Sequence, residues 1–383
     1  MKRNRIAVSI LFFMNGLIYA NWVARLPEIQ SLYGFSNSLL GTVLLCNAAG
    51  AITAMPFAGV ITNRFGSKGV SSATALFFCF VFPFIPFMNT LWVIVPVFFM
   101  MGVCGGSMDV AINGQAVFVE RKYQKPIMSS FHAVFSGAMG LGANIGALFA
   151  KWGTPLGWHF IIVSAFCFVI SLWAIFNLID DKTPEFKTST QEGGEEELPK
   201  FRLPTKAILP LGIIAFCGMT GEGSIADWSA NYLNKVVGES EGFAALGVAS
   251  FAWAMFFGRL LGDYIINKLG RRKVLIISCL LSVIGLAFTL SVVNAWVALG
   301  GFFIVGLALS NVVPIIYSMA GNTEGVSPSA GIAMATTVGY AGFFIGPPVI
   351  GYLADIFSLR IGLLFTLSLF VLMLIFVNRF IKK

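Results

Sequence analysis

Long apolar runs separated by short polar turns dominate the pattern of this chain. Each of twelve runs is long enough to cross a bilayer as a helix, for which about 20 residues suffice. We therefore predict an all-α membrane protein with twelve transmembrane helices. The helices are expected over residues 6–25, 39–62, 69–88, 91–119, 127–150, 156–179, 207–233, 242–266, 273–293, 295–320, 328–354 and 360–380.

One long polar stretch, residues 180–206, interrupts this pattern and holds 7 of the chain's 17 acidic residues. Its prolines, glycines and run of three glutamates are typical of a flexible, solvated linker. The stretch divides six predicted helices from six. The predicted organisation is an N-terminal half over residues 1–179, a cytoplasmic linker, and a C-terminal half over residues 207–383.

The two halves also repeat each other. At an offset of 204 residues, Gly66 aligns with Gly270 and Glu120 with Glu324. At an offset of 206, the pair Asn21 and Trp22 aligns with the pair Asp227 and Trp228. Several matches at a nearly constant offset, at equivalent helix positions, predict two pseudo-symmetric six-helix halves.

The composition agrees with a membrane protein and fixes an orientation. The chain is 57% hydrophobic and 11% charged, whereas soluble domains carry about 25% charged residues. If the helices alternate, 20 of the 25 Lys and Arg residues fall on the side of the N-terminus and only four on the other side. The positive-inside rule then predicts that both termini are cytoplasmic. It also accounts for the net charge of +8, so no nucleic-acid partner is expected.

The residue pattern does not indicate an enzyme active site or a metal site. Six cysteines lie in apolar segments without CxxC spacing, and only two histidines are present. We expect no metal site and no cofactor. No nucleophile–base spacing is evident either, so we expect no catalytic residues and no enzyme.

A carboxylate inside the fourth predicted helix is the most informative single residue. Asp109 lies well within an apolar run, and Asn113, four residues on, shares its helical face. A charge at that depth costs about 2.5 to 3.5 kcal/mol on insertion scales, and such residues often mark ion or substrate paths. The alternative is a structural carboxyl bonded to a neighbouring helix.

Two loops carry the pattern of a known family. Residues 59–68, Gly-Val-Ile-Thr-Asn-Arg-Phe-Gly-Ser-Lys, resemble the loop 2–3 signature of the major facilitator superfamily, G-x-x-x-D-R-x-G-R-[RK]. Asn63 replaces the acid and Ser67 a basic residue. Residues 262–273 look like the second copy. The resemblance spans essentially the whole chain and implies the major facilitator fold, with a small-molecule substrate in a lipid bilayer.

Within that superfamily, finer resemblances suggest a subgroup. The spacing from Asp109 to Asn113 is similar to the helix-4 pattern of proton-coupled fucose permeases. Residues 222–228 and 335–352 look like the YbjJ-type bacterial members. These resemblances imply a multi-pass protein of the bacterial inner (plasma) membrane, coupled to protons, and we expect a monomer.

Proton coupling has three candidates. Asp109 and Glu222 are both expected within the membrane, where loss of solvent disfavours the charged form. Glu222 should lie near the midplane, where repeat-built transporters bind substrate. His132, at the start of the fifth helix, could exchange protons with Asp109, or simply hydrogen-bond between helices. Which acid carries the proton stays open.

Polar and aromatic groups on several helices are candidates to bind substrate. On helix 1, Arg25 could clamp a ligand carboxylate, although the protein's own Asp227 is the favoured partner. Trp22 and Trp228 are most simply interfacial belt residues, with stacking on a sugar-like ring as the alternative. The full set of candidates is Asn21, Trp22, Arg25, Asn113, Gln115, Asn144, Asp227, Trp228, Trp253, Asn311, Tyr317 and Tyr340.

The basic loops are the candidate gates, because the superfamily's two signature loops latch the halves on the cytoplasmic side. With Asn63 in place of the acid, the first latch lacks its usual ion pair. Arg259 and Asp263, four apart in helix 8, could pair for the second latch, and Glu120 and Glu324 could receive basic side chains. The candidate gating residues are Asn63, Arg64, Lys68, Glu120, Arg259, Asp263, Arg271, Arg272 and Glu324.

These observations favour a secondary active transporter that moves a sugar or similar small polar solute by alternating access, coupled to protons. The alternatives are proton-driven efflux of amphiphilic compounds and a non-transporting membrane receptor or scaffold.

Overall fold

The computed structural model of the chain describes residues 2–88, 90–124, 127–181, 205–324, 326 and 328–381. Within these residues, twelve helices are long and apolar enough to cross a membrane. Each predicted apolar run falls on one of them, with ends that differ by about four residues or fewer. The fold prediction of an all-α membrane protein with twelve spans is therefore confirmed. Most of the predicted linker lies outside the described residues.

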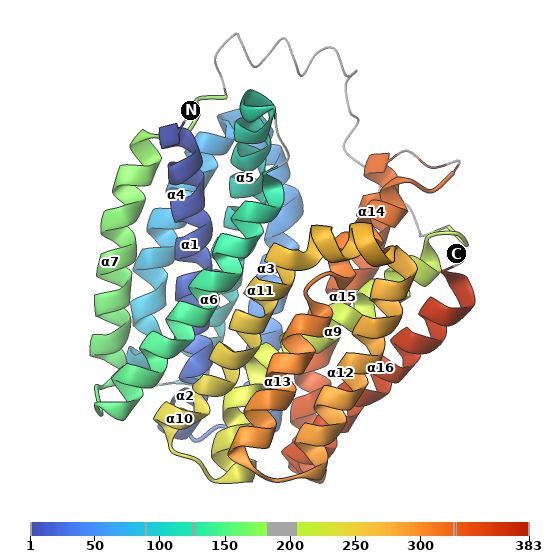
Figure 1. The fold of residues 1–383 in the computed structure, drawn as a ribbon. Helices are drawn as coiled ribbons and strands as arrows, with labels where there is room; N and C mark the ends of the chain where they lie inside the picture. Colours follow the sequence, from blue (N-terminus) through green and yellow to red (C-terminus); the bar gives the residue numbers. More distant parts are fainter. Residues whose placement is uncertain are drawn as a thin grey trace. The chain divides into compact units, whose positions relative to one another are not determined.

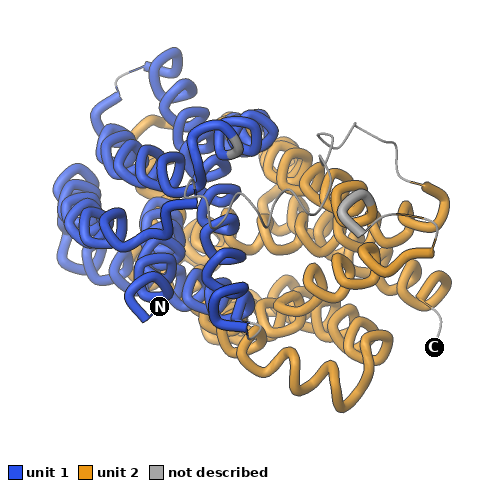
Figure 2. Tube along the Cα trace, turned by 90° about the horizontal axis from the view of Figure 1, so that it is seen from above, with its two compact units in different colours: residues 1–22, 46–197 blue, residues 23–45, 198–383 orange. Residues whose placement is uncertain are grey.

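The chain divides into two compact units (Figure 2). The first unit comprises residues 1–22 and 46–197, and the second comprises residues 23–45 and 198–383. The predicted division between halves stays a prediction. The compact units differ from it at residues 23–45, which belong to the N-terminal half by sequence but pack with the C-terminal helices.

Unit 1 contains most of α1 and of α3 together with four further long helices (Figure 1). A short 3-10 turn, η1, extends α4. The helices are α1 (Lys2–Ala24), α3 (Asn37–Phe65), α4 (Ser67–Val81), η1 (Phe82–Phe87), α5 (Leu91–Tyr123), α6 (Met128–Lys151) and α7 (Leu156–Phe176).

Unit 2 contains the last residues of α1, the first turns of α3, and the helices of the C-terminal half. Three short elements lie at one end of it, namely α2, η2 and α10. The elements are α2 (Leu26–Tyr33), α9 (Leu209–Tyr232), η2 (Leu233–Val237), α10 (Glu241–Ala244), α11 (Leu246–Leu269), α12 (Arg271–Ser291), α13 (Ala295–Leu309), α14 (Val312–Gly321), α15 (Pro328–Ile356) and α16 (Leu359–Phe380).

Small residues set the closest packing in unit 1. A side chain at Gly102 of α5 would collide with the backbone carbonyl of Asn47 on α3. Such contact between helix backbones is typical of membrane helices, which gain little from the hydrophobic effect among themselves. Gly105, one turn away, would meet nothing within 4 Å. One face of α5 is therefore packed against α3, and the face that carries Gly105 is not.

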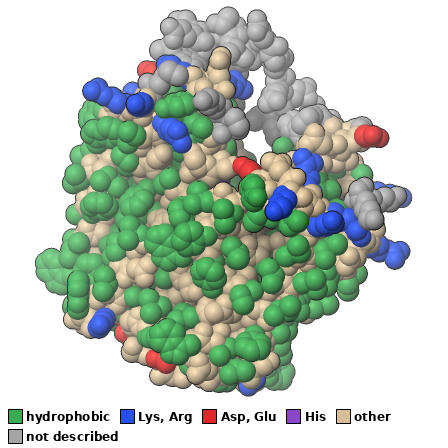
Figure 3. All heavy atoms as spheres, viewed as in Figure 1, with side chains coloured by type: hydrophobic (Ala, Val, Ile, Leu, Met, Phe, Trp, Pro, Cys, Tyr) green, Lys and Arg blue, Asp and Glu red, His purple; other side chains and the backbone are tan. Residues whose placement is uncertain are grey.

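The surface agrees with a lipid environment. Large apolar side chains such as Phe57, Phe176 and Phe288 are more than half exposed, and hydrophobic groups cover most of the face seen in Figure 3. In water, so much exposed apolar area would lead to aggregation, whereas in a bilayer it is solvated.

α15 contains two adjacent prolines, Pro347 and Pro348, and its helix runs from Pro328 to Ile356 through both of them.

Candidate functional site

Unit 1 holds Asp109 with one identified polar partner. The Nδ2 of Asn113 donates to the Asp109 carboxylate at 3.1 Å and to the Asp109 backbone carbonyl at 2.8 Å. Both side chains are partly exposed on the surface of unit 1. Within the described part of the chain, no Lys, Arg or His forms a salt bridge with Asp109. The shared helical face was predicted from the spacing, and the contact confirms that the two groups meet.

Unit 2 holds Glu222 in a different setting. The guanidinium of Arg259 on α11 lies 3.4 Å from the Glu222 carboxylate on α9. The two side chains are only 22% and 17% exposed, with the carboxylate the more exposed. Asp263, the partner expected for Arg259, is exposed instead, and no salt bridge to it is found among the described residues. The predicted Arg259–Asp263 pair is thus corrected, because Arg259 points toward α9 and Asp263 points outward.

Helix 1 supplies structural contacts rather than an open polar surface. The Nδ2 of Asn21 donates to the Leu17 carbonyl at 2.7 Å, and its Oδ1 lies 2.8 Å from Nε2 of His159. Asn21 and His159 are both fully buried. In this structure the Asn21 amide holds α1 against α7, and its substrate-binding role stays a prediction.

The two repeat-related tryptophans are buried, not lipid-facing. Trp22 is 2% exposed and lies edge-on to Tyr19 and Phe98. Trp228 is 0% exposed. The belt prediction is therefore wrong for both. Exposed tryptophans at helix ends, such as Trp92 at 88%, fit an interfacial belt far better.

Two amides that were predicted to bind substrate donate hydrogen bonds to other groups of the protein. The Nε2 of Gln115 donates to Ser67 at 2.7 Å and to the Ile179 carbonyl at 2.8 Å. The Nδ2 of Asn311 donates to the Gly258 carbonyl at 3.0 Å and to Ser310 at 2.9 Å. Both amide hydrogens are used in each case. Gln115 and Asn311 thus tie parts of the fold together, and their substrate-binding roles stay predictions.

Four other candidates keep part of their surface exposed. Asn144 donates only to its own helix, at Gly140, 3.0 Å away. Trp253 stacks on Phe257 with ring centroids 6.2 Å apart. The hydroxyl of Tyr317 lies 3.7 Å from the Met219 sulfur, and the Tyr340 ring lies 5.9 Å from that of Phe343. Their substrate-binding roles stay predictions.

Arg25 and Asp227 are both buried in unit 2, at 2% and 8% exposure. The Arg25 guanidinium pairs with Glu28, three residues on. Asp227 was the expected partner of Arg25, so Glu28 adds a partner that the sequence analysis did not name.

The candidate gating residues of unit 1 have local partners. The Glu120 carboxylate accepts from the backbone N–H groups of Ile127 and Met128 at 2.7 and 2.8 Å, so it caps the start of α6. Asp181 accepts from the backbone N–H of Ser67 at 2.6 Å and from that of Lys68 at 3.5 Å. The Arg64 guanidinium lies over the ring of Phe65. The side chain of Asn63 lies outside the described residues.

In unit 2, Arg272 anchors a helix end. Its Nε donates to the Ile381 carbonyl at 2.8 Å. Arg271 and Glu324 are exposed. His132, the candidate relay in unit 1, packs edge-on to Phe12 at 5.4 Å. The gating and relay roles stay predictions.

A polar cluster at the α2 end of unit 2 was not predicted from the sequence. It involves Glu28, Gln30, Asn231, Glu241 and Asp355. The helix that carries Glu28 had a readable signal, because Pro27 and an acidic residue in the first turn are typical of a helix start. No comparable signal in the sequence indicated the contacts that Glu28 makes with other helices.

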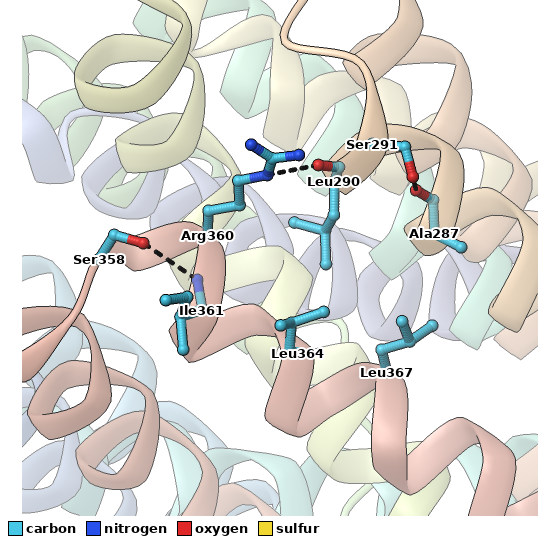
Figure 4. A pocket seen from close by; sticks show the side chains of 8 residues that line it. All are labelled: Ala287, Leu290, Ser291, Ser358, Arg360, Ile361, Leu364 and Leu367. Atoms are coloured by element: carbon cyan, nitrogen blue, oxygen red, sulfur yellow. Dashed lines mark hydrogen bonds between the residues drawn. The ribbon is translucent and has the colours of Figure 1, made fainter.

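A groove of about 450 Å³ lies between α12 and α16 (Figure 4). Arg360 lies at one end and donates to the Leu290 carbonyl. The lining below it, including Ile361 and Leu364, is apolar and exposed. These exposed leucine and isoleucine side chains fit contact with lipid better than recognition of a polar solute.

In the described residues, twelve helices long and apolar enough to cross a membrane, several of which carry polar groups in their interior, define a polytopic helical membrane protein. The family model of the Major Facilitator Superfamily matches residues 8–323 and 211–382. An uncharacterized MFS-type transporter of Yersinia pestis is 35% identical over 360 residues, which cover 94% of this chain and 91% of the relative. The chain belongs to the Major Facilitator Superfamily, and it is a membrane transporter rather than an enzyme.

Solved structures show the same fold. The nucleoside transporter NupG superposes with a TM-score of 0.75 at 13% identity and covers 100% of both chains. A D-xylose–proton symporter superposes with a TM-score of 0.75 at 16% identity, over 99% of this chain and 98% of that one. At such identities the similarity concerns the fold alone. The fucose-permease resemblance stays a prediction.

Proposed function

We propose that the chain is a proton-coupled transporter that takes up a sugar or similarly polar small solute by alternating access. The observation that carries the proposal is the contrast between two acids at membrane depth. Asp109 has an amide partner and no salt bridge among the described residues, whereas Glu222 is paired with Arg259. The D-xylose–proton symporter of the same fold supports the solute class.

Asp109 is the proposed proton carrier. A carboxylate without a cation is costly in a low-dielectric setting, and it becomes cheaper when protonated. Asn113 suits either state, because its NH2 group can donate a hydrogen bond to the carboxylate and its carbonyl oxygen can accept one from the neutral acid. A group that can load and unload a proton without breaking an ion pair fits a coupling role.

The Glu222–Arg259 pair is the proposed solute site. The Glu222 carboxylate supplies hydrogen-bond acceptors and the Arg259 guanidinium supplies donors, 3.4 Å apart. A sugar hydroxyl can donate to the first and accept from the second. The partial exposure of the pair leaves both groups accessible to a solute.

The proposed orientation places both termini in the cytoplasm of a bacterial inner membrane. It rests on the distribution of basic residues, 20 against four, between the two sides. On this orientation, the end of unit 2 that carries α2 and α10 faces outward.

The test is uptake into proteoliposomes. Purified protein is screened by thermal shift against sugars, polyols and nucleosides, since a bound ligand raises apparent stability. Radiolabelled hits are then offered to proteoliposomes with an acid exterior. We expect accumulation that a protonophore abolishes. Equilibration without accumulation, at every imposed gradient, would contradict the proposed coupling.

A further inference from the structure

Residues 23–45 join parts of the chain that the sequence repeat keeps apart. By sequence they end helix 1 and begin helix 2 of the N-terminal half, yet they pack into unit 2 (Figure 2). They contain α2, which packs against α9, and the first turns of α3. In Figure 1, α2 and α10 lie close together at one end of this unit. The segment therefore links the N-terminal half to the C-terminal helices.

The first link is a cap on α3. The carboxylate of Asp355, in the last turn of α15, accepts from the backbone N–H of Asn37 at 2.9 Å and from that of Ser38 at 2.8 Å. These donors belong to the first turn of α3, where backbone N–H groups have no partner within the helix and the helix dipole favours an anion. Lys235 lies near enough to Asp355 to interact electrostatically.

The second link is a buried amide pair. The Nδ2 of Asn231 on α9 donates to Oε1 of Gln30 on α2 at 2.6 Å. The Nε2 of Gln30 donates in turn to the Phe35 carbonyl at 3.0 Å and to Oδ1 of Asn37 at 3.1 Å. Gln30 and Asn231 are 2% and 0% exposed. Separating them would expose or orphan several donors and acceptors.

The helix backbones also touch at this end. A side chain added at Gly41 of α3 would lie 2.6 Å from the Pro347 carbonyl of α15, and one at Gly351 would collide with the Asn37 carbonyl. Such close approach requires glycine at both positions. The Asp355 cap therefore lies at a tightly packed contact between α3 and α15.

The third link is a pair of carboxyl groups. The Glu28 carboxyl of α2 lies close enough to that of Glu241 in α10 for the two to interact, and Arg25 pairs with Glu28. Two ionised carboxylates repel each other, whereas one shared proton allows a hydrogen bond between them. Among the described residues, Arg25 and Glu241 are the charged groups that act on Glu28. Burial, and then Glu241, raise the pKa of Glu28 to about 7, while Arg25 lowers it.

We propose that residues 23–45 form a latch on the C-terminal helices, closed by Asp355, Asn231 and Glu241, and that the Glu28–Glu241 pair is a proton-binding site that strengthens the closed latch. The inference rests on the proposed function, because alternating access with the proposed orientation requires this end to open toward the outside. A proton that arrives from outside then favours closure of the outer end.

The direction of the pH effect follows from the raised pKa. When the latch opens, Glu28 loses its burial and its carboxyl partner and returns toward its ordinary pKa. The proton is then held more tightly in the closed state. Closure is fully favoured below the ordinary pKa of about 4.5, and this contribution is lost as the pH rises through about 7.

The test measures the latch directly and needs no substrate. Spin labels are placed on cysteines at Ser31 of α2 and Phe357 just beyond α15, both exposed, in an otherwise cysteine-free chain in nanodiscs. We expect the short-distance population to fall roughly three-fold or more between about pH 5.5 and about pH 8.5. A distribution that does not change with pH would overturn the proton site.

Three variants separate the parts of the inference. Glu28→Gln keeps a neutral hydrogen-bonding group, so the latch should stay closed at both pH values. Asp355→Asn should open the latch at both, because an amide is a poorer cap than a carboxylate. Glu239→Gln removes the same charge two residues from Glu241 and should titrate like the parent. A Glu28→Gln chain that still titrates, or an Asp355→Asn chain with the parent's distances, overturns the respective part.

The proposed function can fail separately. If uptake into proteoliposomes shows no proton coupling while the labelled latch still titrates, the coupling proposal is wrong and the latch holds. If coupling is found and the distances do not respond to pH, the latch is wrong.

Discussion

Arg259 and Glu222 lie 37 residues apart in the chain, yet their charged groups meet at 3.4 Å within the membrane-spanning part of unit 2. Each group is less than a quarter exposed, so either charge would destabilise the fold if its partner were absent. The pair consequently stabilises α9 against α11 while presenting both charges to any solute that reaches it.

We expect removal of one partner to destabilise more than removal of both. Arg259→Gln leaves the Glu222 carboxylate without its cation, and the apparent melting temperature should fall by several degrees. In the double variant with Glu222→Gln, two neutral amides face each other and most of the loss should be recovered. Thermal unfolding in detergent, followed by tryptophan fluorescence, measures both. A double variant no more stable than Arg259→Gln would show that the pair carries no coupling energy.

The close contact between α3 and α5 yields a prediction with a matched control. Gly102→Ala places a methyl group against the Asn47 carbonyl, and neither backbone can yield without parting the helices. We expect a severe loss of folded protein, seen as a collapse of the monodisperse peak in size-exclusion chromatography. Gly105→Ala adds the same methyl group where nothing lies within 4 Å, and its yield should match the parent. Equal yields for both variants would contradict the packing described for α5.

Glu28 predicts a pH dependence of stability. Its pKa is raised in the folded state to about 7, so its contribution is present at acid pH and is lost as the pH rises through that value. Glu28→Gln cannot titrate. We expect the parent and the variant to melt at similar temperatures at about pH 5, and the parent to become the less stable of the two at about pH 8. Parallel melting curves at all pH values would show that Glu28 does not take up the proton.

Orientation is tested by labelling in intact cells. Single cysteines at Ser189, in the predicted linker, and at Phe357, which is exposed just beyond the end of α15, are introduced into a cysteine-free chain. The distribution of basic residues predicts that an impermeant maleimide reaches Phe357 and leaves Ser189 unlabelled until the cells are lysed. Labelling of Ser189 before lysis would reverse the proposed topology.

The helices were predictable because a helix that crosses lipid needs a long, continuous run of apolar residues, which can be seen directly in the sequence. A run of apolar residues has the length of the bilayer, so its position can be read without knowing its neighbours. The Asp109–Asn113 contact was predictable for a similar reason, since residues four apart share a helical face. The signature loops identified the superfamily.

Contacts between helices were not predictable in this way. Local spacing suggested Asp263 as the partner of Arg259, but the rotation of α11 turns Arg259 toward Glu222 and leaves Asp263 exposed. The same limit applies to Gln115 and to Trp22, whose burial depends on which face of the helix meets a neighbour. The latch residues were hard to predict for two reasons. α2 is too short to give a clear sequence pattern, and its partner Asn231 on α9 lies about 200 residues further along the chain.

The proton-carrier assignment makes the sharpest prediction about transport. Asp109 accepts a hydrogen bond from Asn113 at 3.1 Å and forms no salt bridge within the described residues. Asp109→Asn keeps the size and the polarity of the side chain but cannot titrate, so it should abolish proton-driven accumulation while leaving substrate exchange within about two-fold of the parent. Glu222→Gln removes the partner of Arg259, and it should instead weaken substrate binding by about ten-fold or more, with coupling intact for whatever is transported. Exchange and gradient-driven uptake, measured in the same proteoliposomes, distinguish the two phenotypes. Full accumulation by Asp109→Asn would exclude it as the carrier, and a swap of the two phenotypes would assign that role to Glu222.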